Sequence, residues 1–212
     1  MSDADFLTLQ QWLSPAFPVG GFAWSHGLES AIDAGAVTDG ATLAGWLETV
    51  VSRGSGAADA ALLAAAMAPG ADHGALAVLA RALAGSAERL AETEGQGAAF
   101  TSAHNALTNR DFPPVPLPVA LGRAARDLRL GPATVAAHFL QAFAANLVSA
   151  AVRFIPLGAT EGQVVLAELR PVILATAERA ARTAPDDITL SQPGADVASL
   201  AHETMPVRIF RS

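Results

Sequence analysis

The chain contains no cysteine, and this absence removes several kinds of chemistry at once. Disulfides, iron-sulfur clusters, thiolate zinc sites and cysteine nucleophiles all need a thiol, so none of them is available to this protein. A chain without disulfides suits a reducing compartment, and the cytoplasm is the expected location.

Lysine is also missing, so all positive charge comes from 13 arginines, and the net charge is −7. A nucleic-acid-binding protein needs enough positive charge to follow a phosphate backbone. We therefore expect no nucleic acid among the partners.

Signals for a membrane or for secretion are scarce. The mean hydropathy of +0.35 is high, but alanine supplies much of it. No stretch approaches the roughly 20 strongly apolar residues of a spanning helix. The first 12 residues carry Asp3 and Asp5 and no basic start, unlike a secretory signal. The sequence predicts no membrane partner.

Catalytic and cofactor motifs are missing as well. Neither Gly20-Gly21 nor Gly54-Ser-Gly56 has the preceding strand and the following Lys-Ser/Thr of a phosphate-binding loop. No serine stands in a Gly-x-Ser-x-Gly elbow, and the five histidines form no known metal-binding spacing. The sequence therefore predicts no catalytic residue, no cofactor and no resident metal.

Alanine, the strongest helix former, dominates what is present, and runs of β-branched residues are few. With 212 residues, the chain fits one domain. These features predict an all-α, single-domain bundle of about eight helices with an extended C-terminal tail. The expected helices include 24–34, a helix capped by Asp39 that reaches Arg53, one from Ser86 to Asn109, and 160–182.

The segment Ser14–Glu29 interrupts this helical pattern with two prolines, two adjacent glycines and three large aromatic residues. Proline fixes φ, and glycine allows close backbone approach, so a defined loop shape is predicted. The aromatic residues then bury surface on a neighbouring element or a partner chain, and the candidates are Phe17, Phe22 and Trp24.

His26 and Glu29 stand three residues apart, so on a helix they would share a face. Such a pair is compatible with metal chelation or with a base role in a small helical hydrolase. A metalloenzyme usually needs at least three protein ligands, however, and no third ligand follows from the spacing. We therefore place His26 and Glu29 among the partner-binding candidates.

The character of the chain changes at Pro185, which divides a helical domain, 1–184, from a C-terminal tail, 185–212. The tail is polar, yet apolar residues punctuate it, and an exposed Ile-Phe pair between arginines is unusual for a free end. Arginine can donate several hydrogen bonds to a partner. The partner-binding candidates in the tail are His202, Glu203, Arg208, Ile209, Phe210 and Arg211.

Three segments, 14–29, 156–163 and 202–212, together resemble signatures of the urease accessory protein F family (UreF). The resemblance implies an all-α protein without catalytic activity that forms a homodimer. It also implies two accessory partners, the β-rich scaffold UreD/UreH and the GTPase UreG, and GTP-dependent delivery of nickel to apo-urease. It further implies a C-terminal tail that becomes ordered on the scaffold.

Three residues depart from the family pattern: Pro206 replaces a common tyrosine, and Ala159 and Glu161 replace glutamine and aspartate. Contacts that need those side chains are not expected here. Two other functions remain open on the residues alone, the helical metal-dependent hydrolase and a helical regulator of another GTPase.

Overall fold

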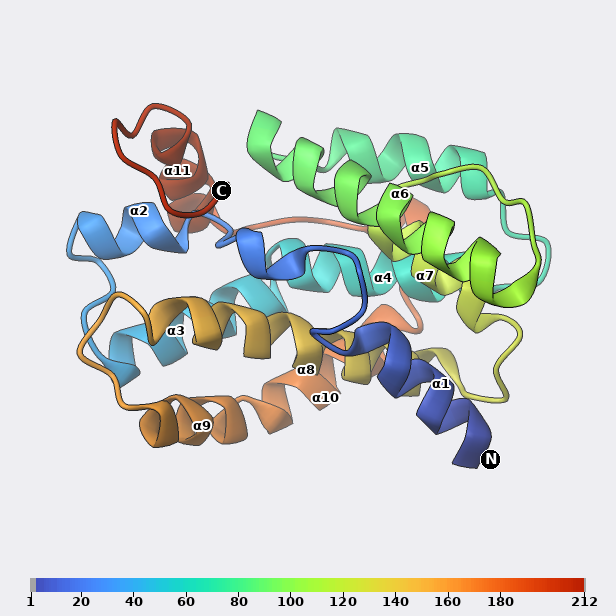
Figure 1. The fold of residues 1–212 in the computed structure, drawn as a ribbon, viewed down its shortest axis with the longest axis horizontal. Helices are drawn as coiled ribbons and strands as arrows, with labels where there is room; N and C mark the ends of the chain where they lie inside the picture. The colour runs from blue at the N-terminus through green and yellow to red at the C-terminus, as the bar shows by residue number, and fades with distance from the viewer. Residues whose placement is uncertain (1–2, 212) are drawn as a thin grey trace.

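The computed structural model describes residues 3–211, and within them every regular element is helical (Figure 1). Over residues 3–211, eleven α-helices and two short 3₁₀ helices follow one another, against an expectation of about eight. The α-helices are α1 (Asp3–Leu13), α2 (Leu28–Asp33), α3 (Gly40–Ser52), α4 (Ser55–Met67), α5 (His73–Ala82), α6 (Ala87–Thr108), α7 (Leu117–Ala125), α8 (Pro132–Ala151), α9 (Ala159–Glu168), α10 (Arg170–Ala180) and α11 (Pro193–His202), and the 3₁₀ helices are η1 (Gly21–Ala23) and η2 (Pro185–Asp187).

Two helix starts lie where the sequence predicts them. Asp39 accepts a hydrogen bond from the Thr42 amide at 2.9 Å, while the Thr42 hydroxyl accepts one from the Asp39 amide at 3.0 Å. Ser86 caps α6 by accepting from the Arg89 amide at 3.1 Å. These bonds satisfy amides that have no partner inside the helix.

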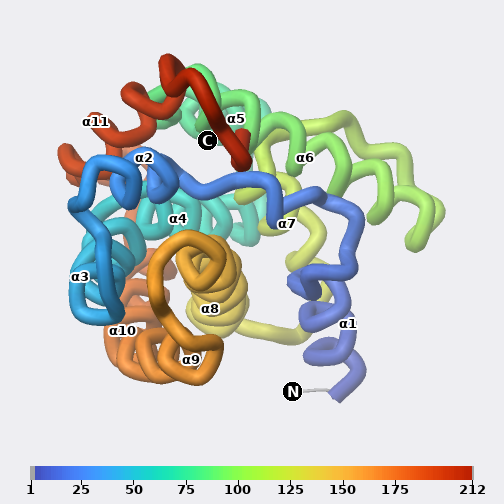
Figure 2. The backbone as a smooth tube through the Cα atoms, turned by 60° about the vertical axis from the view of Figure 1, so that its left-hand side comes forward, coloured from blue at the N-terminus to red at the C-terminus, as the bar shows by residue number. Residues whose placement is uncertain are grey.

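The core is organised around α8, which Figure 2 shows nearly end-on with α1, α3, α4, α9 and α10 around it. Its buried side chains include Val135, Leu140, Leu147 and Val148. A second group of helices, α4, α6 and α7, packs beside it. The 14–27 loop, α2 and α11 lie across the end of this arrangement.

Within residues 3–211, α8 has the length and apolar composition to cross a membrane, contrary to the expectation from the sequence. Only 44% of its most apolar window is buried in the fold. Core helices of soluble proteins pass the same test, so the finding is weak evidence for a membrane span.

The helix expected over 24–34 was wrong in its first half. His26 and Gly27 adopt positive φ angles of 55° and 76°, so the chain turns twice before α2 begins at Leu28. A Cβ at Gly27 would lie 2.6 Å from the backbone nitrogen of Ser199, which explains the need for glycine there.

The helix expected over 160–182 is two helices, because Pro171 stands in the first turn of α10 and cannot donate a helical hydrogen bond. The tail is not extended as expected, since it contains η2 and the ten-residue α11. Ile188 and Ala195 from the tail are buried in the core. The boundary at residue 184 stays a prediction.

Gly97 lets α6 lie directly against the chain that enters α7. A Cβ at this position would overlap the Val115 carbonyl oxygen and lie 2.7 Å from the Leu117 nitrogen. Gly95, on the same helix, has no atom within 4 Å of the corresponding point. The two glycines therefore have the same helical backbone, and they differ in whether a neighbouring segment packs against them.

We predict that Gly97→Ala lowers the free energy of unfolding by about 2 kcal/mol, because the backbone atoms it meets cannot move aside cheaply. Gly95→Ala serves as the control and should raise stability by up to about 1 kcal/mol through helix propensity. Chemical denaturation measures both. Equal effects of the two substitutions would contradict the packing described here.

Candidate functional site

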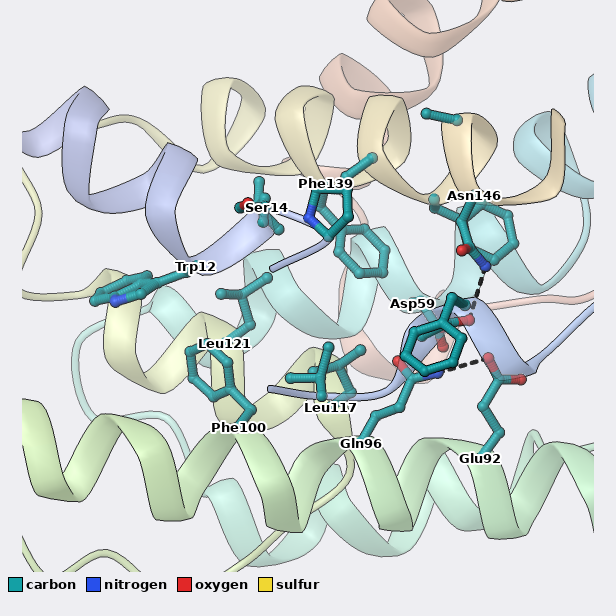
Figure 3. Close-up of a pocket in the computed structure, with 18 of the residues that line it drawn as sticks. Trp12, Ser14, Asp59, Glu92, Gln96, Phe100, Leu117, Leu121, Phe139 and Asn146 are labelled. Atoms are coloured by element: carbon teal, nitrogen blue, oxygen red, sulfur yellow. Dashed lines mark hydrogen bonds between the residues drawn. The ribbon is translucent and has the colours of Figure 1, made fainter. Parts of the chain in front are cut away.

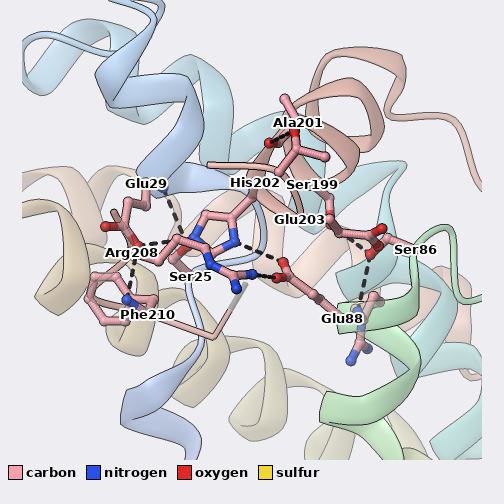
Figure 4. Close-up of polar contacts among 12 residues, drawn as sticks. Ser25, Glu29, Ser86, Glu88, Ser199, Ala201, His202, Glu203, Arg208 and Phe210 are labelled. Atoms are coloured by element: carbon pink, nitrogen blue, oxygen red, sulfur yellow. Dashed lines mark hydrogen bonds and ion pairs between the residues drawn. The ribbon is translucent and has the colours of Figure 1, made fainter. Parts of the chain in front are cut away.

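Residues 203–211, here called the C-terminal strap, fold back from α11 onto α2 and the 14–27 loop (Figure 4). The Arg211 amide donates to the Ala23 carbonyl at 2.8 Å. The Phe210 ring is buried and lies 5.4 Å from that of Phe154. The last described residues of the chain therefore pack against its N-terminal region.

Glu29, on the first turn of α2, receives three hydrogen bonds from the C-terminal end of the chain. The amides of Ile209 and Phe210 donate to its carboxylate, each at 2.9 Å, and His202 Nε2 lies 3.0 Å from Oε2. Burial alone would raise the pKa of Glu29, but these three donors outweigh burial and lower it below the ordinary value of 4.5. Glu29 is thus an ionised, buried acceptor that holds the strap.

Glu88, in the first turn of α6, contacts the same histidine from the other side. Its Oε2 lies 2.8 Å from His202 Nδ1, and its Oε1 accepts from Arg208 Nη1 at 2.6 Å. The side chain of His202 is fully buried, whereas that of Arg208 is 42% exposed. This cluster, Glu29, Glu88, His202 and Arg208, is called the strap cluster below.

Two further contacts, one from α11 and one from the first residue of the strap, reach the start of α6. Glu203 accepts from the Ala87 amide at 2.8 Å, and the hydroxyls of Ser86 and Ser199 lie 2.7 Å apart. The strap is therefore attached to α2 and to α6 together.

A second buried cluster lies on the next turns of α6. Glu92 lies 2.9 Å from His26 Nε2, accepts from Gln96 at 2.8 Å and pairs with Arg89 at 3.4 Å, while Arg89 also pairs with Asp59 of α4. Burial would raise the pKa of Glu92, but His26 and Arg89 lower it. Burial raises the pKa of Asp59 in spite of Arg89.

This second cluster forms one wall of a cavity of about 350 Å³ between the 14–22 loop and helices α6, α7 and α8 (Figure 3). Aromatic side chains supply much of the remaining wall, among them Trp12, Phe100 and Phe139. Asn146 also lines the cavity, and its amide donates to the carbonyls of Gly21 and Trp24. The same loop thus borders the cavity and holds the strap.

The three aromatic candidates of the loop differ in how far they are exposed to solvent. Phe17 is buried against Phe100, with ring centroids 5.6 Å apart. Trp24 is buried, and the guanidinium of Arg211 lies 5.9 Å from its ring. Phe22 is 63% exposed. Of the three, only Phe22 presents most of its surface to solvent.

His26 and Glu29 do not form the pair that helical spacing suggested. His26 lies outside α2 and contacts Glu92, whereas Glu29 contacts His202. Residues 3–211 hold no group of three or more His, Asp or Glu side chains arranged to bind a metal ion. The helical hydrolase alternative therefore loses the residue pair on which it rested.

Sequence reasoning placed none of the following residues among the site candidates: Asp59, Glu88, Arg89, Glu92 and Gln96. The sequence did carry a signal for two of these residues. Positions 92, 96 and 100 follow a four-residue spacing, which places Glu92 and Gln96 near the apolar Phe100 on the helix surface. Acidic residues on such a face indicate buried ion pairs.

Several known proteins are similar to this chain over nearly its whole length. The UreF family model matches residues 37–170. A urease accessory protein UreF of Cereibacter sphaeroides (strain KD131) is 57% identical over 99% of both chains. The UreF proteins of Paracoccus denitrificans (53% identical, 99% of this chain and 97% of the relative) and Roseobacter denitrificans (47%, 100% and 96%) are also similar.

The chain belongs to the UreF family. Its function accordingly lies in urease maturation, and its relatives are accessory proteins of urease. The family model ends at residue 170, before α11 and the strap, whereas the full-length UreF relatives extend across both. Of the three departures noted in the sequence, Pro206 is exposed in the strap, and Ala159 and Glu161 lie in the first turn of α9.

We predict that Glu29→Gln lowers the free energy of unfolding by about 2 kcal/mol near neutral pH, because an amide replaces a charged acceptor of three donors. The pKa of Glu29 is lowered in the folded state, so this stabilisation is present above 4.5 and is lost as the pH falls through the folded-state pKa. Denaturation of both proteins as a function of pH measures it. A difference that persists unchanged into strong acid would contradict the assignment.

Proposed function

We propose that this UreF protein is a non-enzymatic bridge between the β-rich scaffold UreD/UreH and the GTPase UreG, and that the assembly inserts nickel into apo-urease in a GTP-dependent way. The tail supplies the scaffold contact. The partner-binding surface comprises the exposed face of α11 and the strap. Membership of the UreF family favours this function over regulation of an unrelated GTPase.

One observation carries the proposal: the strap is fixed at its backbone, yet it exposes apolar side chains. Val207 is 75% exposed and Ile209 is 71% exposed, although the Ile209 amide is held by buried Glu29. On α11, Val197 and Leu200 are 67% and 51% exposed. Exposed apolar side chains on an ordered segment favour a protein interface there.

The charged residues of the strap supply a polar rim for this surface. Arg208 reaches Glu88 with one nitrogen, and its partly exposed guanidinium has further donors for a partner. Arg211 is exposed next to Trp24. An apolar centre with arginine at its edge matches the usual composition of interfaces.

The other members of the proposed assembly contact other surfaces. We propose a homodimer, the commonest closed arrangement of identical chains, acting in the cytoplasm. Light scattering of the isolated chain tests the dimer, and a monomer mass at every accessible concentration would contradict it. Co-purification with UreD/UreH, UreG and apo-urease tests the wider assembly.

Adjacent residues of the strap allow a matched test of scaffold binding. We predict that Ile209→Ala weakens scaffold affinity by about tenfold, since burial of an exposed aliphatic side chain is worth about 1.5 kcal/mol or more. Isothermal titration with purified scaffold measures this. The melting temperature of the isolated protein should stay unchanged, because Ile209 makes little contact within the chain.

Phe210→Ala is the contrasting variant. Its ring is only 6% exposed, so the substitution should destabilise the isolated chain by about 3 kcal/mol as well as weaken scaffold binding. Burial in the folded chain thus distinguishes Phe210 from the adjacent, exposed Ile209. Scaffold affinity that survives both substitutions would refute the strap as the contact.

A further inference from the structure

The cavity beside α6 has the size and the lining of a small-molecule site. Its volume is about 350 Å³, and a protein cavity of only about 150 Å³ is large enough to hold benzene. Sites for small molecules are mostly apolar pockets of roughly 300–1,000 Å³ with a few polar groups in fixed positions. The described residues that line this cavity run from Trp12 to Arg153, so its wall is built without α11 or the strap.

The polar wall of the cavity holds more carboxylates than permanent cations. Asp59 and Glu92 both line it, and Arg89 is the buried cation that pairs with the two of them. His26, which contacts Glu92, adds a positive charge only when it is protonated. Arg153 also lines the cavity, but it is exposed, and solvent screens its charge.

Asp59 is the group in this wall whose charge is least compensated. Its side chain is 13% exposed, and burial raises its pKa in spite of the ion pair with Arg89. An ionised carboxylate can accept up to about four hydrogen bonds, so one that pairs with Arg89 can also accept from a ligand. A second cation inside the cavity would therefore stabilise the ionised form of Asp59.

The aromatic wall supplies the other half of such a site. Trp12, Phe100 and Phe139 line the cavity, and Figure 3 shows Trp12 and Phe100 toward the end away from Asp59. The faces of aromatic rings attract organic cations, and the attraction grows when water is excluded. A ligand with a positive group at one end and an apolar body at the other would match both walls.

We propose that this cavity binds a small organic cation, with an ammonium or guanidinium group beside Asp59 and Glu92 and an apolar body of about one ring against the aromatic wall. The N–H groups of the cation donate to the carboxylate oxygens. Gln96, which donates to Glu92 at 2.8 Å, helps to fix the position of that carboxylate. This site is separate from the scaffold contact proposed for the strap, and neither depends on the other.

Three probes of similar size and different charge test the proposal on the full-length chain labelled with ¹⁵N at about pH 7: 2-phenylethylammonium, 2-phenylethanol and phenylacetate. The side-chain amide signals of Gln96 and Asn146 report binding, because both residues line the cavity. The cation should shift both signals and bind at least about tenfold more tightly than the alcohol. Equal affinity of cation and alcohol, tighter binding of phenylacetate, or unshifted signals with every probe would overturn the proposal.

Two variants that remove the same charge separate the cavity from the overall charge of the protein. Asp59→Asn keeps the size of the side chain and should weaken binding of the cation at least about tenfold, while the affinity of the alcohol stays nearly unchanged. Glu94→Gln is the control, since Glu94 lies on α6 outside the cavity and pairs with Arg81, and it should change neither affinity. Cation binding that survives Asp59→Asn would refute the role of Asp59, and the three probes on the wild-type chain decide the question if that variant does not fold.

Discussion

A single buried carboxylate, that of Glu29, joins the two ends of this chain. It accepts from His202, Ile209 and Phe210, which lie more than 170 positions away in the sequence. Without this acceptor, two strap amides and one ring nitrogen of the buried His202 would lose their hydrogen-bond partner, which is costly for buried groups. The position of the strap, and hence the exposure of Ile209, depends on this contact.

Helix α6 carries both polar clusters on one face. Glu88 belongs to the strap cluster, whereas the adjacent Arg89 contacts Asp59, and Glu92, one turn later, contacts His26 beside the cavity. The 14–27 loop contacts both clusters, because His26 belongs to one and the Ala23 carbonyl receives the strap. A substitution in the loop is therefore expected to affect cavity and strap together. This arrangement explains why the loop needs a defined shape.

Local signals in the sequence were sufficient for the helical class and for helix starts at Asp39 and Ser86, because capping depends on neighbours within three residues. They failed where distant parts of the chain decide the structure. The turn at Gly27 is set by close approach to α11. Glu88 can be recognised as a site residue only when its contact with the distant His202 is known. The helix α11 was read as tail because polar residues and Pro193 surround its start.

Hydrogen exchange at the Ile209 and Phe210 amides of the isolated chain tests the central claim most directly. Both amides donate to a buried carboxylate, so they should exchange at least about tenfold more slowly than in an unstructured peptide at neutral pH. Glu29→Gln should remove most of that protection and leave the core of α8 protected. Exchange at the unstructured rate in the wild-type chain would contradict a strap held by Glu29.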